Sequence, residues 1–221
     1  MMDLDALVAS ARQKAAVRSE AAVSDGRVAE LVNEGYAEVL GEADWPFMYV
    51  DETVTATSGT STVVLPTAFR KASSVLAARV RLDETRLEDL DGLSQEDRDE
   101  EGGPVVYAWR DDRTIELWPA PGSDMDVTVI GYASTPTLAG IDVPAFAAEF
   151  HPLLAYVAAG KLLAEFGDDS GRMDGFRAEA SSILYRMTRR YLRTSDSGRV
   201  QMGGRARQRG RSSRMYQRRW R

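Results

Sequence analysis

The fold is decided by the stretch LLAYVAAGKLLAEF at residues 153–166. It is the later part of a helix that we predict from Pro144 to Phe166. From Leu153 onward this helix is apolar almost all the way round, and its only charges are Lys161 and Glu165, four residues apart on one edge. A helix this apolar must be surrounded by other protein. It is too short and too interrupted to cross a membrane.

A second helix follows the turn at residues 167–170, which offers N-cap side chains. Its apolar residues recur at intervals of three and four, so they form one stripe. The stripe consists of Met173, Phe176, Ala180, Ile183, Leu184, Met187 and Tyr191. Arginines lie mostly off the stripe and gather toward the C-terminal end, where they suit the helix dipole. Together the two helices predict a helical hairpin at the centre of the protein.

Two further helices are predicted before residue 46. The first follows the acidic residues Asp3 and Asp5, and the second runs from an N-cap at Ser24 or Asp25 to Gly41. Their apolar faces are Leu4, Leu7, Val8, Ala11 and Ala15 in one, and Val28, Leu31, Val32, Tyr36, Val39 and Leu40 in the other. The sequence Trp45-Pro46-Phe47 then stops the helix. We expect it to form a hydrophobic plug between helices and sheet.

From Met48 the hydrophobic period changes from 3.6 to 2, which indicates strands. The predicted strands cover residues 48–56, 60–65, 75–82, 105–110, 113–118 and 127–132. The run from Asp83 to Glu101 holds ten carboxylates against two arginines, so we expect a solvated loop there, with a short strand near residues 86–90. The sequence therefore predicts an α+β fold. A helical bundle (residues 1–46 and 143–193) is interrupted by an inserted antiparallel β module (47–142) and followed by an extended arginine-rich C-terminal tail (194–221).

Composition excludes several kinds of chemistry. The chain has no cysteine and one histidine, His151, so it offers no thiolate nucleophile, no cysteine zinc site and no histidine-based triad. We interpret His151 as a capping or packing residue. The turn from Asp168 to Gly171 lacks the ligand spacing of a calcium loop. Neither a Walker-type phosphate loop nor a nucleophile elbow is present. We therefore predict no catalytic residues, no metal and no cofactor.

Charge is divided unevenly along the chain. The net charge is −6, but residues 194–221 hold nine arginines and one aspartate, so they carry +8 and the remainder carries −14. Such a segment, poor in aliphatic residues, cannot bury enough surface to fold alone. Arginine suits both phosphates and acidic protein grooves, whereas Tyr216 and Trp220 suit anchoring in a protein pocket. The predicted partner-binding residues are Arg199, Arg205, Arg207, Arg209, Arg211, Arg214, Tyr216, Arg218, Arg219, Trp220 and Arg221.

The order of motifs along residues 1–193 resembles the head-to-tail adaptor (head-completion, connector) proteins of tailed bacteriophages. After two N-terminal helices, the motifs that carry this resemblance are Trp45-Pro46-Phe47, Val64-Leu65-Pro66, Leu117-Trp118-Pro119-Ala120-Pro121, Gly131-Tyr132 followed by Thr135-Pro136, and His151-Pro152-Leu153-Leu154. None of them is a catalytic signature, and the arginine-rich tail matches no motif of the family.

The resemblance implies a structural virion protein at the head-to-tail junction, assembled in the host cytoplasm. It implies a homo-oligomeric twelve-fold ring that binds the portal protein ring on one side and a tail or stopper protein on the other, and that extends the channel for genomic DNA. An acidic body would let DNA slide because it does not attract phosphates. Two alternatives stay open: a nucleic-acid-binding protein that acts through its arginine-rich tail, and a hydrolase that uses paired carboxylates.

Overall fold

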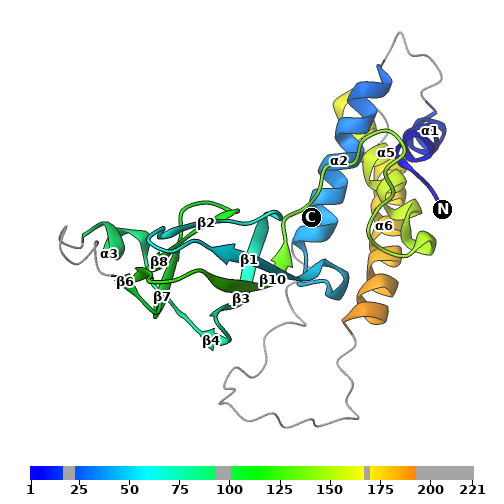
Figure 1. Cartoon of the computed structure of the whole chain (residues 1–221). Coiled ribbons are helices and arrows are strands. Elements are labelled where there is room, and N and C mark those ends of the chain that lie inside the picture. Colours follow the sequence, from blue (N-terminus) through cyan, green and yellow to red (C-terminus); the bar gives the residue numbers. More distant parts are fainter. Residues whose placement is uncertain (17–22, 93–100, 167–169, 193–221) are drawn as a thin grey trace.

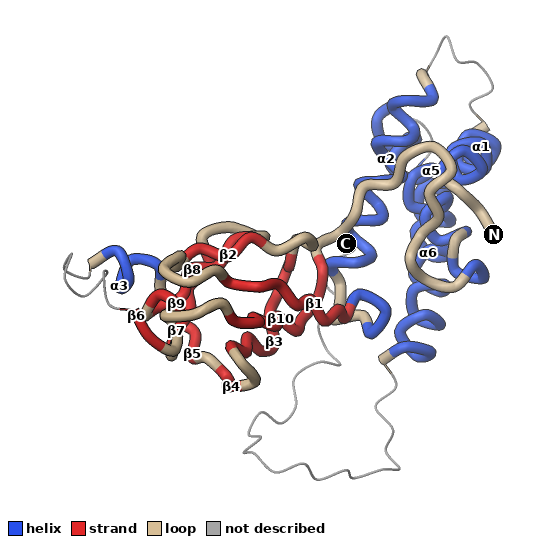
Figure 2. The backbone as a smooth tube through the Cα atoms, in the orientation of Figure 1, coloured by secondary structure: helices blue, strands red, loops and turns tan. Residues whose placement is uncertain are grey.

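The computed structural model describes residues 1–16, 23–92, 101–166 and 170–192. Within these ranges the chain is mixed α+β, as the sequence predicts. Helices from both ends of the chain lie together, and the strands lie beside them (Figure 1). We call residues 1–48 and 134–192 the helical region and residues 49–133 the β region. Figure 2 shows that the helices, apart from a short one, lie on one side of the molecule and the strands on the other.

The helical region is built around one central helix. Its elements are α1 (Leu4–Ala15), α2 (Asp25–Gly41), the 3₁₀ turns η1 (Pro46–Met48) and η2 (Ala148–Phe150), α5 (Pro152–Phe166) and α6 (Ser170–Tyr191). Helices α1, α2 and α6 all pack on α5, whose Leu153, Leu154 and Leu162 are at most 1% exposed. Asp3 caps α1 by accepting a hydrogen bond from the Ala6 amide, and Ser24 caps α2 by accepting one from the Arg27 amide.

The predicted plug lies where α2 and α6 end. Trp45 is fully buried, and its indole Nε1 donates a hydrogen bond to the Val39 carbonyl at 2.9 Å. Its ring stacks on Phe47 at a centroid distance of 5.8 Å, and Phe47 meets Tyr191 edge-on at 4.9 Å. The plug therefore holds the C-terminal ends of α2 and α6 together beside the first strand.

Helix α5 begins later than the sequence predicts. We expected it from Pro144, but it starts at Pro152, after η2. The reason lies in the backbone amides between the two prolines. Ala145 donates to the Tyr36 hydroxyl at 3.0 Å and Ala147 to the Tyr191 hydroxyl at 3.1 Å, so tertiary contacts hold this segment in a non-helical path. Pro152 suits a first helical turn because no amide hydrogen is needed there.

The β region consists mainly of two four-stranded sheets. One has the order β1-β10-β3-β4 and the other β2-β8-β7-β5, and a short pair joins β6 to β9. Most pairs are antiparallel, but β5–β7 and β6–β9 are parallel. The strands are β1 (Tyr49–Ala56), β2 (Thr62–Val64), β3 (Phe69–Ala77), β4 (Val80–Arg81), β5 (Asp83–Glu84), β6 (Glu101–Gly102), β7 (Val106–Trp109), β8 (Thr114–Trp118), β9 (Ala120–Pro121) and β10 (Met125–Ala133). Val75, Val127 and Val129 from one sheet and Ile115 and Leu117 from the other share a second buried core.

Two predicted strands are wrong in position or kind. The strand expected at residues 75–82 is β3, which starts at Phe69 and ends at Ala77, because Ala78 and Arg79 turn the chain with positive φ angles of 48° and 70°. The strand expected near residues 86–90 is a helix, α3 (Leu87–Asp91), whose Leu90 is buried. Its acidic first turn suits a helix N-terminus. The predicted hairpin is confirmed as β7 and β8.

Strand β10 approaches β3 closely at one glycine. A Cβ atom on Gly131 would lie 2.3 Å from the Lys71 carbonyl oxygen, beside an irregularity in the β10–β3 register. Only glycine fits at that point. The pairing of β10 with β3, the two inner strands of this sheet, therefore depends on a single residue without a side chain.

Candidate interaction surfaces

The predicted partner-binding tail lies outside the described residues. This applies to all of its residues from Arg199 to Arg221, so their role stays a prediction. The turn at residues 167–169 also lies outside them. The surfaces described below belong to the helical region and to its junction with the β region.

His151 has the packing role that the sequence predicts. It is 1% exposed, and its Nε2 lies 3.0 Å from the Phe146 carbonyl oxygen. Its Nδ1 lies within hydrogen-bond distance of both the Met2 amide, at 3.1 Å, and the Met2 carbonyl oxygen, at 3.0 Å. Both ring nitrogens are thus occupied by backbone groups. The histidine fixes the N-terminus against η2.

Metal ligands and membrane spans are not seen in the described ranges. Among these residues, no three His, Asp or Glu side chains lie close enough together to hold a metal ion. No helix of residues 1–16, 23–92, 101–166 or 170–192 is both long and apolar enough to cross a membrane. Residues 93–100, which hold four of the ten carboxylates of the acidic run, lie outside the description.

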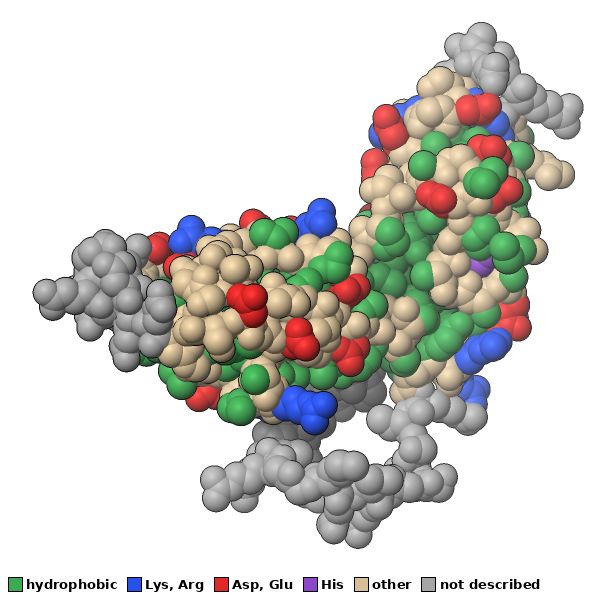
Figure 3. Space-filling view, in the orientation of Figure 1, with side chains coloured by type: hydrophobic (Ala, Val, Ile, Leu, Met, Phe, Trp, Pro, Cys, Tyr) green, Lys and Arg blue, Asp and Glu red, His purple; other side chains and the backbone are tan. Residues whose placement is uncertain are grey.

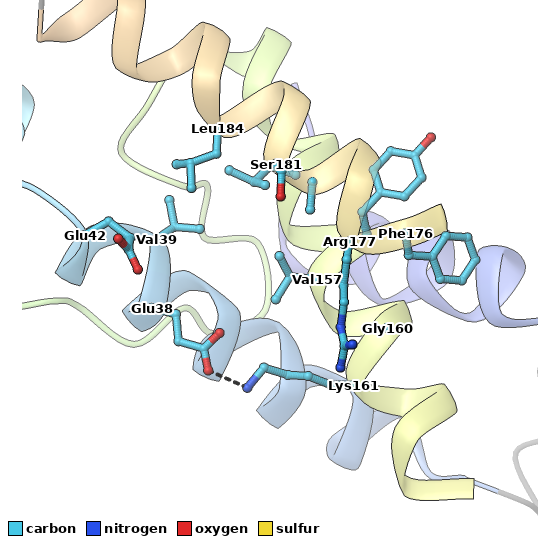
Figure 4. Close-up of a pocket in the computed structure, with 13 residues that line it drawn as sticks. Glu38, Val39, Glu42, Val157, Gly160, Lys161, Phe176, Arg177, Ser181 and Leu184 are labelled. Carbon is cyan, nitrogen blue, oxygen red and sulfur yellow. Dashed lines mark hydrogen bonds and ion pairs between the residues drawn. The ribbon is translucent and has the colours of Figure 1, made fainter. Parts of the chain in front are cut away.

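A groove runs between α2 and α6 with α5 as its floor (Figure 4). It exists because α2 and α6 each pack on α5 but make few contacts with each other. The cavity has a volume of about 230 Å³. Its lining is mainly apolar: Val39, Leu153, Tyr156, Val157, Gly160, Phe176, Ala180 and Leu184, with Glu38, Glu42, Lys161, Arg177 and Ser181 at the rim.

The floor of the groove departs from the expectation that α5 is surrounded on all sides. Leu154, Ala158 and Leu162 are fully buried, as predicted. Val157 and Gly160, by contrast, are only partly covered and line the groove. One side of an almost entirely apolar helix therefore stays open to solvent in this chain.

The close packing of α2 on α5 sets the depth of the groove. At Gly35 a Cβ atom would lie 2.8 Å from Val157 Cγ1, so the two helices touch backbone to side chain there. Lys161 donates hydrogen bonds to Glu38 at 2.7 Å and to Glu34 at 3.1 Å, both in the C-terminal half of α2. Burial lowers the pKa of Lys161, but these two carboxylates outweigh that effect and raise it above its ordinary value.

The two rims of the groove carry opposite charges. Glu42, on the α2 rim, is half-buried, and its carboxylate has no hydrogen-bond or ion-pair partner among the described residues. Arg177, on the α6 rim, is 50% exposed, and its one ion pair within the part of the chain that the structure describes is with Asp174, at 3.7 Å. The groove thus offers an apolar floor, an unpaired carboxylate on one side and a weakly paired guanidinium on the other. This arrangement is suited to recognising a peptide.

Sequence reasoning missed this groove because its walls are far apart in the chain. Glu42 and Arg177 are separated by more than a hundred residues, and each lies off its helix's apolar stripe. In the sequence, Gly35 could have indicated that another element packs closely on α2 near this groove. A glycine inside an otherwise regular helix usually has a packing reason.

A second surface lies at the junction of the two regions. Asp44 accepts hydrogen bonds from Arg70 at 2.9 Å and from Lys71 at 2.7 Å. Beside it, the rings of Tyr49 and Tyr132 meet edge-on at 5.2 Å, and Tyr49 is 49% exposed. On the face shown in Figure 3, acidic side chains are scattered over both regions. The junction is a polar clasp next to an exposed aromatic pair.

Comparison with models of known protein families gives a match. A family model described as "SU10 adaptor protein" matches residues 2–209, which is nearly the whole chain and includes part of the arginine-rich tail. No curated protein matches.

Proposed function

The chain belongs to the SU10 adaptor protein family, and on that premise we propose that it is a structural head-to-tail adaptor of a tailed bacteriophage. The family match over residues 2–209 is the observation that carries this proposal. In this role the protein joins the portal protein ring to a tail or stopper protein. It resides at the head-to-tail junction of the virion after assembly in the host cytoplasm, and its role is structural, not enzymatic.

We further propose that the subunits form a closed ring, which the resemblance to phage head-to-tail adaptors implies to be twelve-fold. Subunits in a ring meet through heterologous contacts that close by rotation. The net charge of −14 over residues 1–193 supports passage of DNA, because a wall of the same sign as the phosphates does not retain the genome. The ring would thereby extend the DNA channel.

The domain division belongs to the same proposal. Residues 1–46 and 143–193 would be the ring-forming helical bundle, 47–142 the inserted β module and 194–221 the docking tail. Two separate buried cores, one in each region, support the boundary between the helical bundle and the β module near residue 47. Hydrogen bonds from Arg70 to the carbonyls of Leu40 and Ala43 support a fixed relation between the two parts.

The tail is proposed to dock on the portal. Ordering more than twenty residues costs about 1–2 kcal/mol each in backbone entropy. Exposed ion pairs return only about 0–1 kcal/mol apiece, so charge alone cannot hold the tail. Tyr216 and Trp220 must therefore be buried by the partner, and repetition around a ring adds avidity.

The function is tested by removing the protein from the particle. Phage that lack it should yield packaged heads without tails that lose their DNA, and full-length protein supplied in trans should restore tailed particles. Electron micrographs measure the fraction of particles with tails, and nuclease protection measures how much packaged DNA the heads retain. Normal tailed, infectious virions from the deletion would refute the proposal.

A second experiment tests the docking tail. Deleting residues 199–221 should leave the remainder folded and abolish attachment to portal-bearing heads. Replacing Tyr216 and Trp220 by Ala should weaken attachment more than replacing any two arginines. If the truncated protein still attached at wild-type occupancy, the tail would not be the dock. Salt-dependent DNA binding lost on the same deletion would favour the alternative, a nucleic-acid-binding protein.

A further inference from the structure

The partly covered apolar side of α5 has the features of a binding site. Three helices pack around this helix, and they leave the sector at Val157 and Gly160 only partly covered. Apolar lining of this kind, with a few polar groups at the rim, is typical of binding sites. The cavity of about 230 Å³ gives room for a large side chain.

We propose that in the free chain this groove binds the arginine- and aromatic-rich segment at residues 214–221 of the same chain. The segment combines Tyr216 and Trp220 with four arginines and has no acidic residue. An aromatic ring would fill the apolar floor, and a neighbouring arginine would pair with Glu42. This inference does not depend on the adaptor function. It would explain how the C-terminal segment is held in the free protein before it binds a partner.

Charge complementarity selects the α2 rim as the side that receives the arginines. Glu42 has no partner among the described residues, and Glu38 is 49% exposed although it already binds Lys161. Arg177 on the α6 rim would repel the same arginines, so the segment has one favourable placement across the groove. A carboxylate with a free bidentate face is the preferred partner of a guanidinium.

The length of chain is sufficient for this contact. Ser181, about halfway along the α6 rim of the groove, lies ten residues before Tyr191 along α6, which corresponds to about 15 Å of helix. The 24 residues from 193 to 216 can span up to about 80 Å when extended. A tether of this kind gives an effective concentration on the order of millimolar. Even a weak contact is therefore formed within one chain, whereas separate chains at micromolar concentration would not form it.

Disulfide trapping in the full-length chain tests the proposal directly. The natural sequence has no cysteine, so a pair introduced by substitution has no competitors. Ser181→Cys places one thiol at the groove, and Gln217→Cys places the other in the segment. Ser182→Cys is the matched control, because Ser182 is exposed on the same helix but does not line the groove.

We expect the Ser181→Cys/Gln217→Cys pair to form an intrachain disulfide at least tenfold faster than the Ser182→Cys/Gln217→Cys pair. Adding Trp220→Ala with Tyr216→Ala, or Glu42→Gln, should slow the reaction severalfold. Glu179→Gln should not, because this exposed α6 residue lies outside the groove. Circular dichroism verifies that each variant is folded.

Equal rates for the two pairs would overturn the proposal, and so would a disulfide that forms only between chains. Indifference of the rate to both the aromatic and the Glu42 substitutions would overturn it as well. The measurement uses the isolated protein without portal, tail or DNA. Its failure is therefore distinguishable from a failure of the adaptor function.

Discussion

The helical region and the β region hold themselves together in different ways. The β region is one continuous stretch of chain, and its core joins small branched side chains from two sheets. The helical region is assembled from the two ends of the described chain, and its core depends on a single helix that touches all the others. A fault in the β region should therefore stay local, whereas a fault in α5 removes the partner of every other long helix.

Breaking the β region at Gly131 should have the largest effect. Gly131→Val places a side chain where a Cβ atom would already lie 2.3 Å from the Lys71 carbonyl oxygen, so β10 must separate from β3. We expect the β region to lose about 4 kcal/mol of stability or more. Urea denaturation followed by β-sheet circular dichroism measures it. Gly103→Ala is the control, because nothing lies within 4 Å of its Cβ position; a loss below about 1 kcal/mol for Gly131→Val would contradict the prediction.

Paired cavity substitutions compare the two cores directly. Leu154→Ala and Ile115→Ala each remove a fully buried aliphatic side chain, one from each core. Each should cost about 2–5 kcal/mol. Hydrogen exchange should then show faster opening of α1, α2 and α6 for Leu154→Ala, and of the two sheets alone for Ile115→Ala. Uniform acceleration over the whole chain by both variants would show that the regions unfold as one unit.

The helix crossing at Gly35 gives a smaller and more specific test. Gly35→Ala would place a methyl group 2.8 Å from Val157 Cγ1, and we expect a loss of about 1–3 kcal/mol because α2 must move off α5. Gly175→Ala is the matched substitution in α6, where nothing lies within 4 Å. It should stabilise the protein by about 0.5–1 kcal/mol through helix propensity. Thermal melting distinguishes the two, and equal effects of the same sign would contradict the close approach.

The polar clasp between the regions should matter least for stability. Asp44→Asn removes the ion pairs that Asp44 forms with Arg70 and Lys71. The Asp44 side chain is 41% exposed. Exposed pairs contribute about 0–1 kcal/mol, so the change should lie within that range and shrink further at high salt. Glu149→Gln, which removes the exposed pair with Arg190, serves as the comparison. A salt-independent loss well above about 1 kcal/mol would mean that the two regions stabilise each other.

Sequence alone predicts the helices and strands best where their periodicity is strong. The apolar stripe of α6, the cap at Ser24 and the hairpin of β7 and β8 all follow from local patterns. The start of α5 could not be predicted, because the hydroxyl groups of Tyr36 and Tyr191 hold the preceding amides from distant positions. The sequence predicts a strand where the structure has helix α3, because a five-residue element is too short to show a period.

The candidate sites divide in the same way. The arginine-rich tail is visible in the composition, and its role stays a prediction because residues 193–221 lie outside the description. The groove is invisible in the sequence, because it forms from what α2 and α6 fail to cover on α5. A pattern of apolar residues indicates that a helix is buried, but it does not show which of its sides a neighbour leaves open.

Hydrogen bonds and helix packing between the N-terminus and the later part of the chain set the order in which this protein can fold on the ribosome. The amide of Met2 bonds to His151 and that of Leu4 to the Asp142 carbonyl, and α1 packs against α5. After β10 leaves the ribosome at Ala133, translation to residue 192 takes about 3–12 s at about 5–20 residues per second. During those seconds the β region can close, while α1 and α2 can contact each other but lack α5, on which both of them pack. The first helices made are among the last to be buried, so the nascent chain passes through an interval in which molecular chaperones have an exposed surface to bind.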